Sequence, residues 1–219
     1  MINRQAAFTS ATLVVVMLAA ALWALGHVPE GTRVPIHYGI DGTPDGWTSA
    51  PVGLFFFPVL GALTWCVFAV LPLIDPRQEN LRRSARAYGA GWVALTVVFA
   101  AIQGITIIYA LGWEFNIARA IPLLVGALLI AIGNILGKIR PNFSMGIRTR
   151  WTLADEEVWD KTHRFGGKTF VLGGAAIMLA TLTLTDPALF AGIIIAVIAG
   201  ITLLPVLKSY LLWRNRTSG

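Results

Sequence analysis

The sequence has little charge, and long parts of it have none. Asp, Glu, Lys and Arg make up 13% of the 219 residues, whereas apolar residues make up 56% and the mean hydropathy is +0.71. Soluble globular domains carry about 25% charged residues. The shortage of charge therefore excludes an ordinary water-soluble domain and indicates a membrane protein.

Six stretches contain no acidic or basic residue, and each approaches the roughly 20 residues that a helix needs to cross about 30 Å of hydrocarbon. Strands of a transmembrane barrel would alternate apolar and polar residues, and these stretches do not. We therefore predict an all-α integral membrane protein with six transmembrane helices. The predicted spans are Ala6–Gly26, Val52–Ile74, Tyr88–Leu111, Ala120–Gly137, Thr169–Thr185 and Ala188–Leu207.

Cysteine is also nearly absent. The lone Cys66 cannot form an intramolecular disulfide, and its place within the second span predicts a small apolar packing residue. The sequence has no Cys-rich metal site, and we predict no cofactor.

Basic residues are almost missing from one side of the predicted topology. If all six spans cross the membrane, 15 Lys and Arg residues fall on one side and only Arg33 and Arg119 on the other. By the positive-inside rule, both termini and the loops 75–87 and 138–168 are cytoplasmic in a bacterial inner membrane. With acidic residues included, the inner side carries about +9 and the outer side about −3. The net charge of +6 thus reflects topology rather than nucleic-acid binding.

The first span follows Arg4, as the core of a signal peptide would follow a basic residue. Ala6–Gly26 is longer than a usual signal core, and the later spans need an insertion partner. We therefore treat it as the first transmembrane helix.

The predicted outer loop, residues 27–51, is rich in turn-forming residues. Its glycines and prolines alternate with Asp, which specifies tight turns, so we predict an ordered loop. Tyr38 and Trp47 suit the level of the lipid headgroups. One imidazole and two carboxylates here could ligate a divalent metal, but Asp before Gly is also an ordinary turn device, and we predict no metal. These candidate ligands are His37, Asp41 and Asp45.

The predicted inner loop, residues 138–168, is longer than a hairpin of two helices requires. Pro141 is expected to end the fourth span. Thr152 is the predicted N-cap of an amphipathic cytoplasmic helix over Leu153–Phe165, because acidic residues follow it in the first turn. Gly166-Gly167 is expected to end that helix.

Trp159 and His163 lie one helical turn apart on this helix, so we predict that they stack or share hydrogen bonds and dock the helix against the bundle. Glu156 and Asp160 lie on the same side as His163, which leaves a metal-dependent hydrolase as an alternative. That site lacks a second His at ligand spacing. The loop 75–87 is predicted to be a short basic helix or turn on anionic lipid, without chemistry of its own.

Two patterns carry a resemblance to a known family. The pattern G-N-x3-K-x-R-P-N-x3-G-I-R-T-x-W-T-L-x4-V-W-x-K-T-H-R, over residues 133–164, resembles the signature of the bacterial Sdp-type immunity protein family. The pattern P-x-H-Y-G-x-D-G-x-P-D-x-W, over residues 35–47, resembles the N-terminal domain of unassigned function that commonly precedes it. The resemblance implies a membrane protein that protects a cell from a secreted peptide toxin. In signalling members it also implies capture of a cytoplasmic transcriptional repressor at the membrane.

The resemblance further implies two units and a set of binding or signalling residues. Residues 1–87 would form a two-helix unit with the ordered outer loop 27–51, and residues 88–219 a four-helix immunity-like unit with the cytoplasmic loop 138–168. The residues carried over on the inner side are Asn134, Lys138, Arg140, Pro141, Asn142, Gly146, Arg148, Thr149, Trp151, Thr152, Trp159, Thr162, His163 and Arg164. Those on the outer side are Pro35, His37, Gly42, Pro44, Asp45 and Trp47.

The leading hypothesis is a non-enzymatic protein that binds and senses a peptide, with the lipid bilayer, a peptide toxin and a repressor as partners and no direct contact with nucleic acid. A transporter or channel for small solutes or peptides is the alternative, although ion pathways usually place ionisable groups within the spans. Gln103 and Asn134 are interpreted as interhelical hydrogen-bonding residues, and Gly133 with Gly137 as a close helix contact. A membrane hydrolase is a second alternative, which lacks an activated nucleophile.

Overall fold

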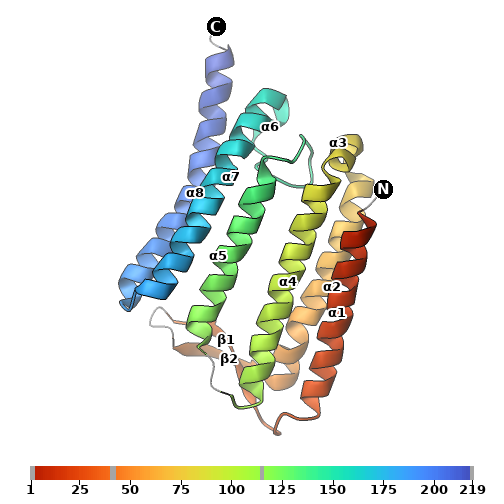
Figure 1. Cartoon of the computed structure of the whole chain (residues 1–219), viewed down its shortest axis with the longest axis vertical. Coiled ribbons are helices and arrows are strands. Elements are labelled where there is room, and N and C mark those ends of the chain that lie inside the picture. The colour runs from red at the N-terminus through yellow and green to blue at the C-terminus, as the bar shows by residue number, and fades with distance from the viewer. Residues whose placement is uncertain (1–2, 40–42, 114–115, 218–219) are drawn as a thin grey trace.

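The chain folds into a bundle of long helices (Figure 1). A computed structural model describes residues 3–39, 43–113 and 116–217. Six helices in these ranges are long and apolar enough to cross a membrane, which confirms the predicted spans. They are α1 (Arg4–Leu25), α2 (Ala50–Ile74), α4 (Ala85–Ala110), α5 (Ile117–Leu136), α7 (Glu156–Thr183) and α8 (Pro187–Thr217). The short elements are α3 (Gln78–Arg83), α6 (Arg150–Ala154), β1 (Arg33–Tyr38) and β2 (Pro44–Ser49).

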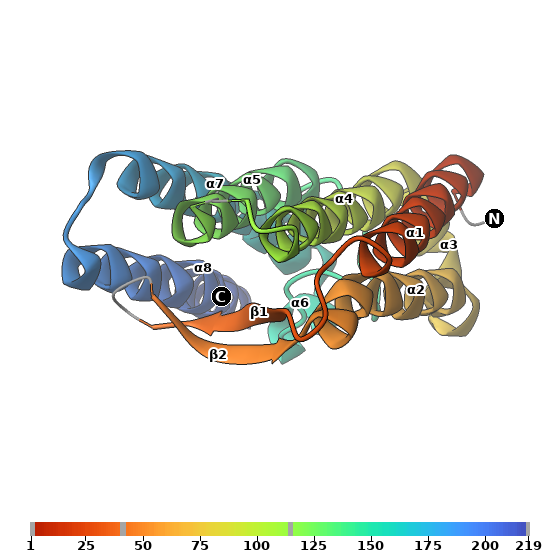
Figure 2. The ribbon, with the colours of Figure 1, turned by 90° about the horizontal axis from the view of Figure 1, so that it is seen from below.

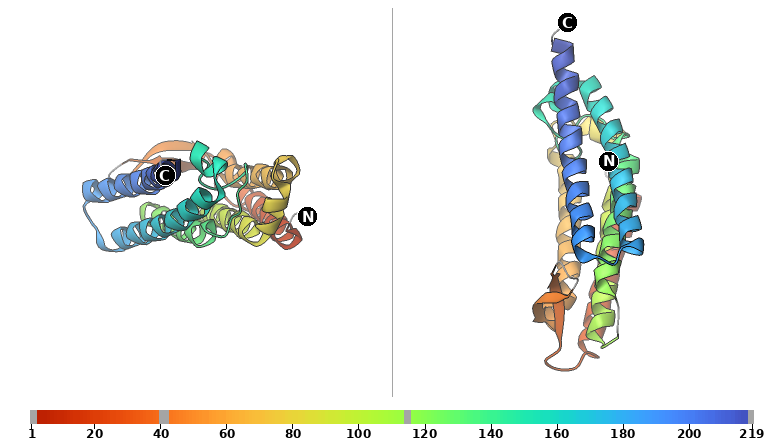
Figure 3. Two further views of the ribbon diagram at one scale, coloured as in Figure 1. Left: turned by 90° about the horizontal axis from the view of Figure 1, so that it is seen from above. Right: turned by 90° about the vertical axis from the view of Figure 1, so that its left-hand side faces the viewer.

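The helices form two layers, which Figure 2 shows from one end. One layer contains α1, α4, α5 and α7 in that order, and the other contains α2 and α8 with the β hairpin between them. We call the end that carries β1 and β2 the hairpin end. The opposite end, with α3, α6 and both ends of the described chain, is called the termini end. Helix α8 projects beyond the other helices there (Figure 3).

Within the described residues, the predicted outer loop contains an antiparallel β hairpin, so the all-α prediction was incomplete. Strands β1 and β2 pair with an irregular register near His37. Val34 is fully buried in a small apolar cluster with Leu54 and Ala110, which ties the hairpin to α2 and α4. The hairpin is therefore fixed to the bundle by packing rather than by its own two strands alone.

Helix α2 contains two prolines, and α4 supplies the hydrogen bonds that they remove. Proline has no N–H, so the carbonyl four residues before it loses its helical donor. Pro58 frees the carbonyl of Leu54, to which Gln103 Nε2 donates at 2.8 Å. Pro72 frees the carbonyl of Phe68, to which the Tyr88 hydroxyl donates at 2.7 Å. The interhelical role predicted for Gln103 is thus confirmed.

Helices α5 and α7 approach closely because glycines face each other along their contact. A Cβ built on Gly133 would lie 2.6 Å from the carbonyl oxygen of Gly167, and one built on Gly126 would lie 2.8 Å from the carbonyl oxygen of Gly174. Gly137 also faces α7. The predicted close contact at Gly133 and Gly137 is confirmed, and any larger residue at Gly133 would push the two backbones apart.

The prediction of a separate cytoplasmic helix over Leu153–Phe165 is wrong at both ends. Thr149 caps the short helix α6, with Thr152 as its third residue, and Asp155 then caps α7. Helix α7 continues through Gly166-Gly167 into the span. These glycines do not end the helix, because they provide room for α5 and Ile147 to pack against it.

Two further expectations are corrected. Cys66 is exposed on the surface of α2 rather than packed inside the bundle. The side chain of Asn134 is also exposed and makes none of the hydrogen bonds found among the described residues. Cys66 on α2 and Asn134 on α5 therefore face outward from the bundle and do not join neighbouring helices.

Candidate functional site

Residues 138–149, here called the dock loop, connect α5 to α6 without regular secondary structure. Several of its residues are nevertheless buried, including Ile139 and Asn142. Buried backbone polar groups need hydrogen-bond partners. Side chains from α7, from α3 and from the residues on either side of α3 supply many of them, so the dock loop is held in one conformation by residues far away in sequence.

Asp75, the residue that ends α2, is the charged group that holds the dock loop most directly. It is 3% exposed. One of its oxygens accepts a hydrogen bond from the Phe143 N–H at 3.0 Å and another from the Ser144 hydroxyl. The other oxygen accepts from the Arg77 N–H at 2.7 Å. A buried carboxylate with three donors is well satisfied, and its removal would leave those donors without a partner.

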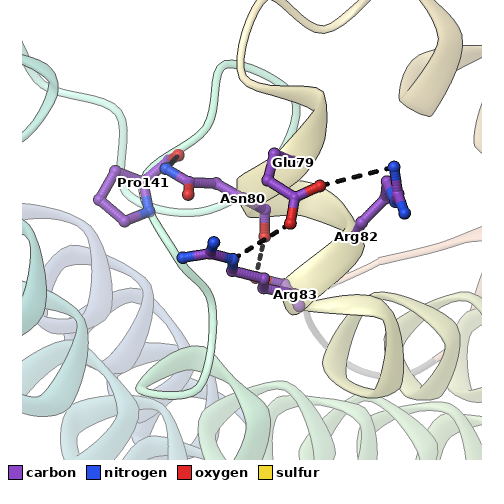
Figure 4. A network of polar contacts seen from close by, with 6 residues as sticks. Glu79, Asn80, Arg82, Arg83 and Pro141 are labelled. Carbon is purple, nitrogen blue, oxygen red and sulfur yellow. Dashed lines mark hydrogen bonds and ion pairs between the residues drawn. The ribbon is translucent and has the colours of Figure 1, made fainter.

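Helix α3 and the residue that follows it hold the start of the dock loop (Figure 4). Asn80 donates to the carbonyl of Pro141 at 2.9 Å, and the Ser84 hydroxyl accepts from the Arg140 N–H at 2.8 Å. Glu79 instead forms exposed ion pairs within its own helix, which contribute little. The loop 75–87 is therefore more than the basic, lipid-facing segment that was predicted.

Asn142 folds the dock loop back on itself. Its side-chain oxygen accepts from the N–H groups of Ser144 and Met145, both at 2.8 Å, and its amide donates to the carbonyl of Arg140 at 2.8 Å. The residue has no exposed surface. Such Asx turns replace the backbone hydrogen bonds of regular structure.

His163 and Trp159 stack as predicted, with ring centroids 3.9 Å apart. The Trp159 indole donates to the carbonyl of Ile139 at 2.7 Å. His163 Nε2 accepts from the Ile147 N–H at 2.9 Å, so the proton lies on Nδ1, which donates to the carbonyl of Trp159 at 2.9 Å. Gly146 precedes this contact at φ +110°, a conformation that favours glycine.

Thr149 and Trp151 join the dock loop and α6 to α8. Thr149 and Thr152 form a reciprocal capping box at the start of α6. The Thr149 hydroxyl also lies 3.0 Å from the hydroxyl of Ser209, and Thr152 donates to the carbonyl of Ile147 at 2.7 Å. Trp151 packs beside Tyr210 with ring centroids 5.2 Å apart. The last helix therefore contacts the same loop as α2, from the other side of the bundle.

The predicted inner residues separate into two groups. Buried residues hold the dock loop, whereas the exposed charged residues leave the termini end basic. Thr162 is buried, and its hydroxyl has no hydrogen-bond partner within the described ranges. Arg148 is exposed and donates to the carbonyl of Phe143. The other exposed basic residues of the predicted set are Lys138, Arg140 and Arg164.

At the hairpin end the structure brings His37 and Asp45 together, with Nδ1 and Oδ1 2.5 Å apart on the surface. Trp47 lies opposite Pro35 in the strand register and packs near Tyr109, with ring centroids 6.3 Å apart. Pro44 pairs with Tyr38, while Asp41 and Gly42 lie outside the described residues. Across residues 3–39, 43–113 and 116–217 there is no group of three potential metal-binding side chains.

Two adjacent cavities lie beneath the hairpin. The first, of about 540 Å³, is mainly apolar and extends between α2 and α4. The second, of about 420 Å³, lies between the start of α5 and the connection from α7 to α8. Tyr38, Ile117 and Ile121 line both. Burial raises the pKa of Tyr38 to about 12, and the Tyr109 hydroxyl adds to this, so the phenol stays protonated.

The predicted site omits four residues that contact the dock loop across more than 50 positions of sequence: Asp75, Arg77, Asn80 and Ser84. One local signal is present: an acidic residue beside Pro at the end of an uncharged span. This local signal does not indicate that the acidic residue contacts the dock loop.

Comparison with known proteins agrees with this arrangement. Residues 138–209 match the SdpI/YfhL protein family, and residues 12–62 match a domain of unknown function, DUF1648. The chain is 33% identical over 151 residues to "Immunity protein SdpI" of Bacillus subtilis (strain 168), and these residues make up 69% of each chain. No solved structure matches. The family match includes the dock loop, α6, α7 and most of α8, and with the identity to the immunity protein it shows that the chain belongs to the SdpI/YfhL protein family.

Proposed function

We propose that this protein gives its cell resistance to a secreted antimicrobial peptide toxin by binding that peptide in the bacterial cytoplasmic membrane. The observation that carries the proposal is the similarity to an immunity protein over most of the chain, in which the family match includes the dock loop. Residues 1–87 and 88–219 would act as two units. The peptide would bind at the hairpin end, whereas the dock loop lies at the termini end.

The contacts of the dock loop support binding rather than catalysis. In the described hydrogen-bond network, both nitrogens of His163 are engaged in holding backbone, so this imidazole is not free to act as a base or a metal ligand. The imidazole of the predicted hydrolase site thus has structural partners at both nitrogens, which favours a non-enzymatic protein.

We also propose that the dock loop reports occupancy of the hairpin end by capturing a cytoplasmic repressor. Helix α2 follows the hairpin directly, and its C-cap residue, Asp75, accepts a hydrogen bond from the dock loop. A displacement of α2 would therefore act on the dock loop through one residue. The exposed residues Lys138, Arg140 and Arg164 are the proposed contact points for that partner.

The proposed orientation places the termini end in the cytoplasm, because 15 of 17 Lys and Arg residues belong to that end. In a Cys66→Ala background, Thr43→Cys should react with an impermeant maleimide in intact cells. Asp160→Cys, at an exposed position of α7, should react only after permeabilisation. Labelling of Asp160→Cys in intact cells would reverse the orientation.

The proposed function is tested by deleting the gene from its own organism and exposing the cells to the secreted peptide fraction of the parent strain. We expect the deletion strain to be inhibited at a peptide dilution at least about tenfold higher than the dilution that inhibits the parent. Expression of the intact chain should restore survival, and protection should saturate as peptide exceeds protein copies. Equal survival of both strains at every dilution contradicts the proposal.

A further inference from the structure

The second cavity at the hairpin end is lined by hydrogen-bond donors that make no bond within the described residues. Arg119, an exposed residue in the first turn of α5, lines the cavity, and its guanidinium makes no hydrogen bond or ion pair with the described residues. Asn116 uses its oxygen to cap α5 at 3.1 Å from the Arg119 N–H, which leaves its amide N–H groups available. The hydroxyl of Tyr38, a residue that lines both cavities, is buried and has no hydrogen-bond partner within residues 3–39, 43–113 and 116–217.

The acidic residue of this cavity, Asp186, uses one of its two carboxylate oxygens to cap a helix. Asp186 Oδ1 accepts hydrogen bonds from the N–H groups of Ala188 and Leu189, at 2.8 and 3.0 Å, and so caps the start of α8. The Thr181 hydroxyl likewise donates to the carbonyl of Ile177. Since the start of α5 also carries the positive end of its helix dipole, the free groups of this cavity favour an anion.

The neighbouring cavity provides a hydrophobic extension of the same site. Its wall includes Phe57 and Ile102, which lie about two turns inside α2 and α4, or roughly 10 Å from the helix ends. Arg119, in contrast, lies at the end of its span, where lipid headgroups meet hydrocarbon. The order of the groups, from charge at the end of the spans to apolar surface within them, matches the order in a phospholipid.

We propose that the two cavities together form a binding site for an anionic phospholipid. The lipid phosphate would accept hydrogen bonds from Arg119 and Asn116, and an acyl chain would occupy the apolar cavity between α2 and α4. Guanidinium and phosphate form charge-assisted, often bidentate pairs, which explains a preference for phosphate over a neutral headgroup. Arg119 and the start of α5 contribute positive charge to the cavity lining, which a lipid phosphate can pair and a cationic peptide cannot, so we favour the lipid as the occupant.

The proposal is tested by native mass spectrometry of the delipidated, full-length protein in neutral detergent, titrated with phosphatidylglycerol or phosphatidylcholine. We expect phosphatidylglycerol to bind at least about tenfold more tightly than phosphatidylcholine. We expect Arg119→Gln to weaken the binding of phosphatidylglycerol by about tenfold to hundredfold. Arg33→Gln is the matched control. Arg33 is the other basic residue of this end, lines neither cavity and donates to the carbonyl of Trp47. Its affinity should equal that of the wild type.

A second variant tests the acyl-chain part without changing charge. Thr106→Phe would fill the apolar cavity, and we expect it to weaken binding of long-chain phosphatidylglycerol more than that of a dihexanoyl form. Thermal unfolding of each variant shows whether it is folded.

Four results would overturn the proposal. They are wild-type affinity in a folded Arg119→Gln variant, equal loss in Arg33→Gln, equal binding of phosphatidylcholine, and full displacement of the lipid by inorganic phosphate at the same concentration. Binding of a cationic amphipathic peptide in lipid-free detergent, with an affinity that Arg119→Gln leaves unchanged, would assign the cavities to a peptide instead. The test does not depend on toxin resistance, so it can fail or succeed separately from the proposed function.

Discussion

Gly133→Leu should force α5 and α7 apart. The first side-chain carbon alone would lie 2.6 Å from the carbonyl oxygen of Gly167 and 2.9 Å from the backbone nitrogen of Val171. Backbone atoms cannot rotate away as a flexible side chain can, so α5 and α7 must separate. We expect a loss of about 3 kcal/mol or more, or roughly 10 °C in Tm, measured by thermal unfolding in detergent.

Gly104→Leu is the control for this substitution. Gly104 lies inside α4, and a Cβ built there meets nothing within 4 Å. The change adds the same side chain to a transmembrane helix, and we expect Tm to stay within a few degrees of the wild type. Equal Tm values for the Gly104 and Gly133 variants would show that the α5–α7 contact does not need its glycines.

Asp75→Ala should release the dock loop from α2. The substitution removes the acceptor for the Phe143 and Arg77 N–H groups and for the Ser144 hydroxyl. Each unpaired donor costs about 1 kcal/mol or more where it stays buried, so we expect a total of about 3 kcal/mol. Tm should fall by roughly 6–12 °C. Limited proteolysis should then cleave within residues 138–149, which the wild type protects.

Glu79→Ala is the matched control, because it removes a carboxylate four positions away that forms only exposed ion pairs with Arg82 and Arg83. Such pairs contribute about 0–1 kcal/mol, so Tm should barely change. Asp75→Asn keeps one acceptor oxygen and should lie between the two. A proteolysis pattern that is unchanged in Asp75→Ala would show that the dock loop is held by its other contacts.

The spans and the stacked pair were predictable because their signals are local. Uncharged stretches of membrane-spanning length appear directly in the sequence, and Trp159 and His163 must lie on one side of any helix that contains both. The start of α7 was not predictable in the same way. Gly166-Gly167 can end a helix or let another helix approach, and only the position of α5 decides between the two.

The attachment of the dock loop was beyond local patterns. Asp75 and Ser144 are 69 positions apart, and nothing near either residue indicates the other. The roles of Asn142 and Gly146 were also only partly visible, since turn residues predict a turn but not the contact that the turn makes. His163 was predicted to dock its helix, but its hydrogen-bond partner was not predicted. Its acceptor nitrogen, Nε2, accepts from the N–H of Ile147, the residue after Gly146.

The chemical fate of the peptide tests the central claim, that this protein protects by binding, most directly. Cells that express the chain are exposed to the inhibitory peptide, and the peptide is recovered and weighed by mass spectrometry. The binding account predicts an intact mass in amounts that match the protein copies, both for the wild type and for a folded His163→Asn variant. A cleaved or modified peptide that requires the protein, and that disappears in folded His163→Asn, would contradict it and indicate an enzyme.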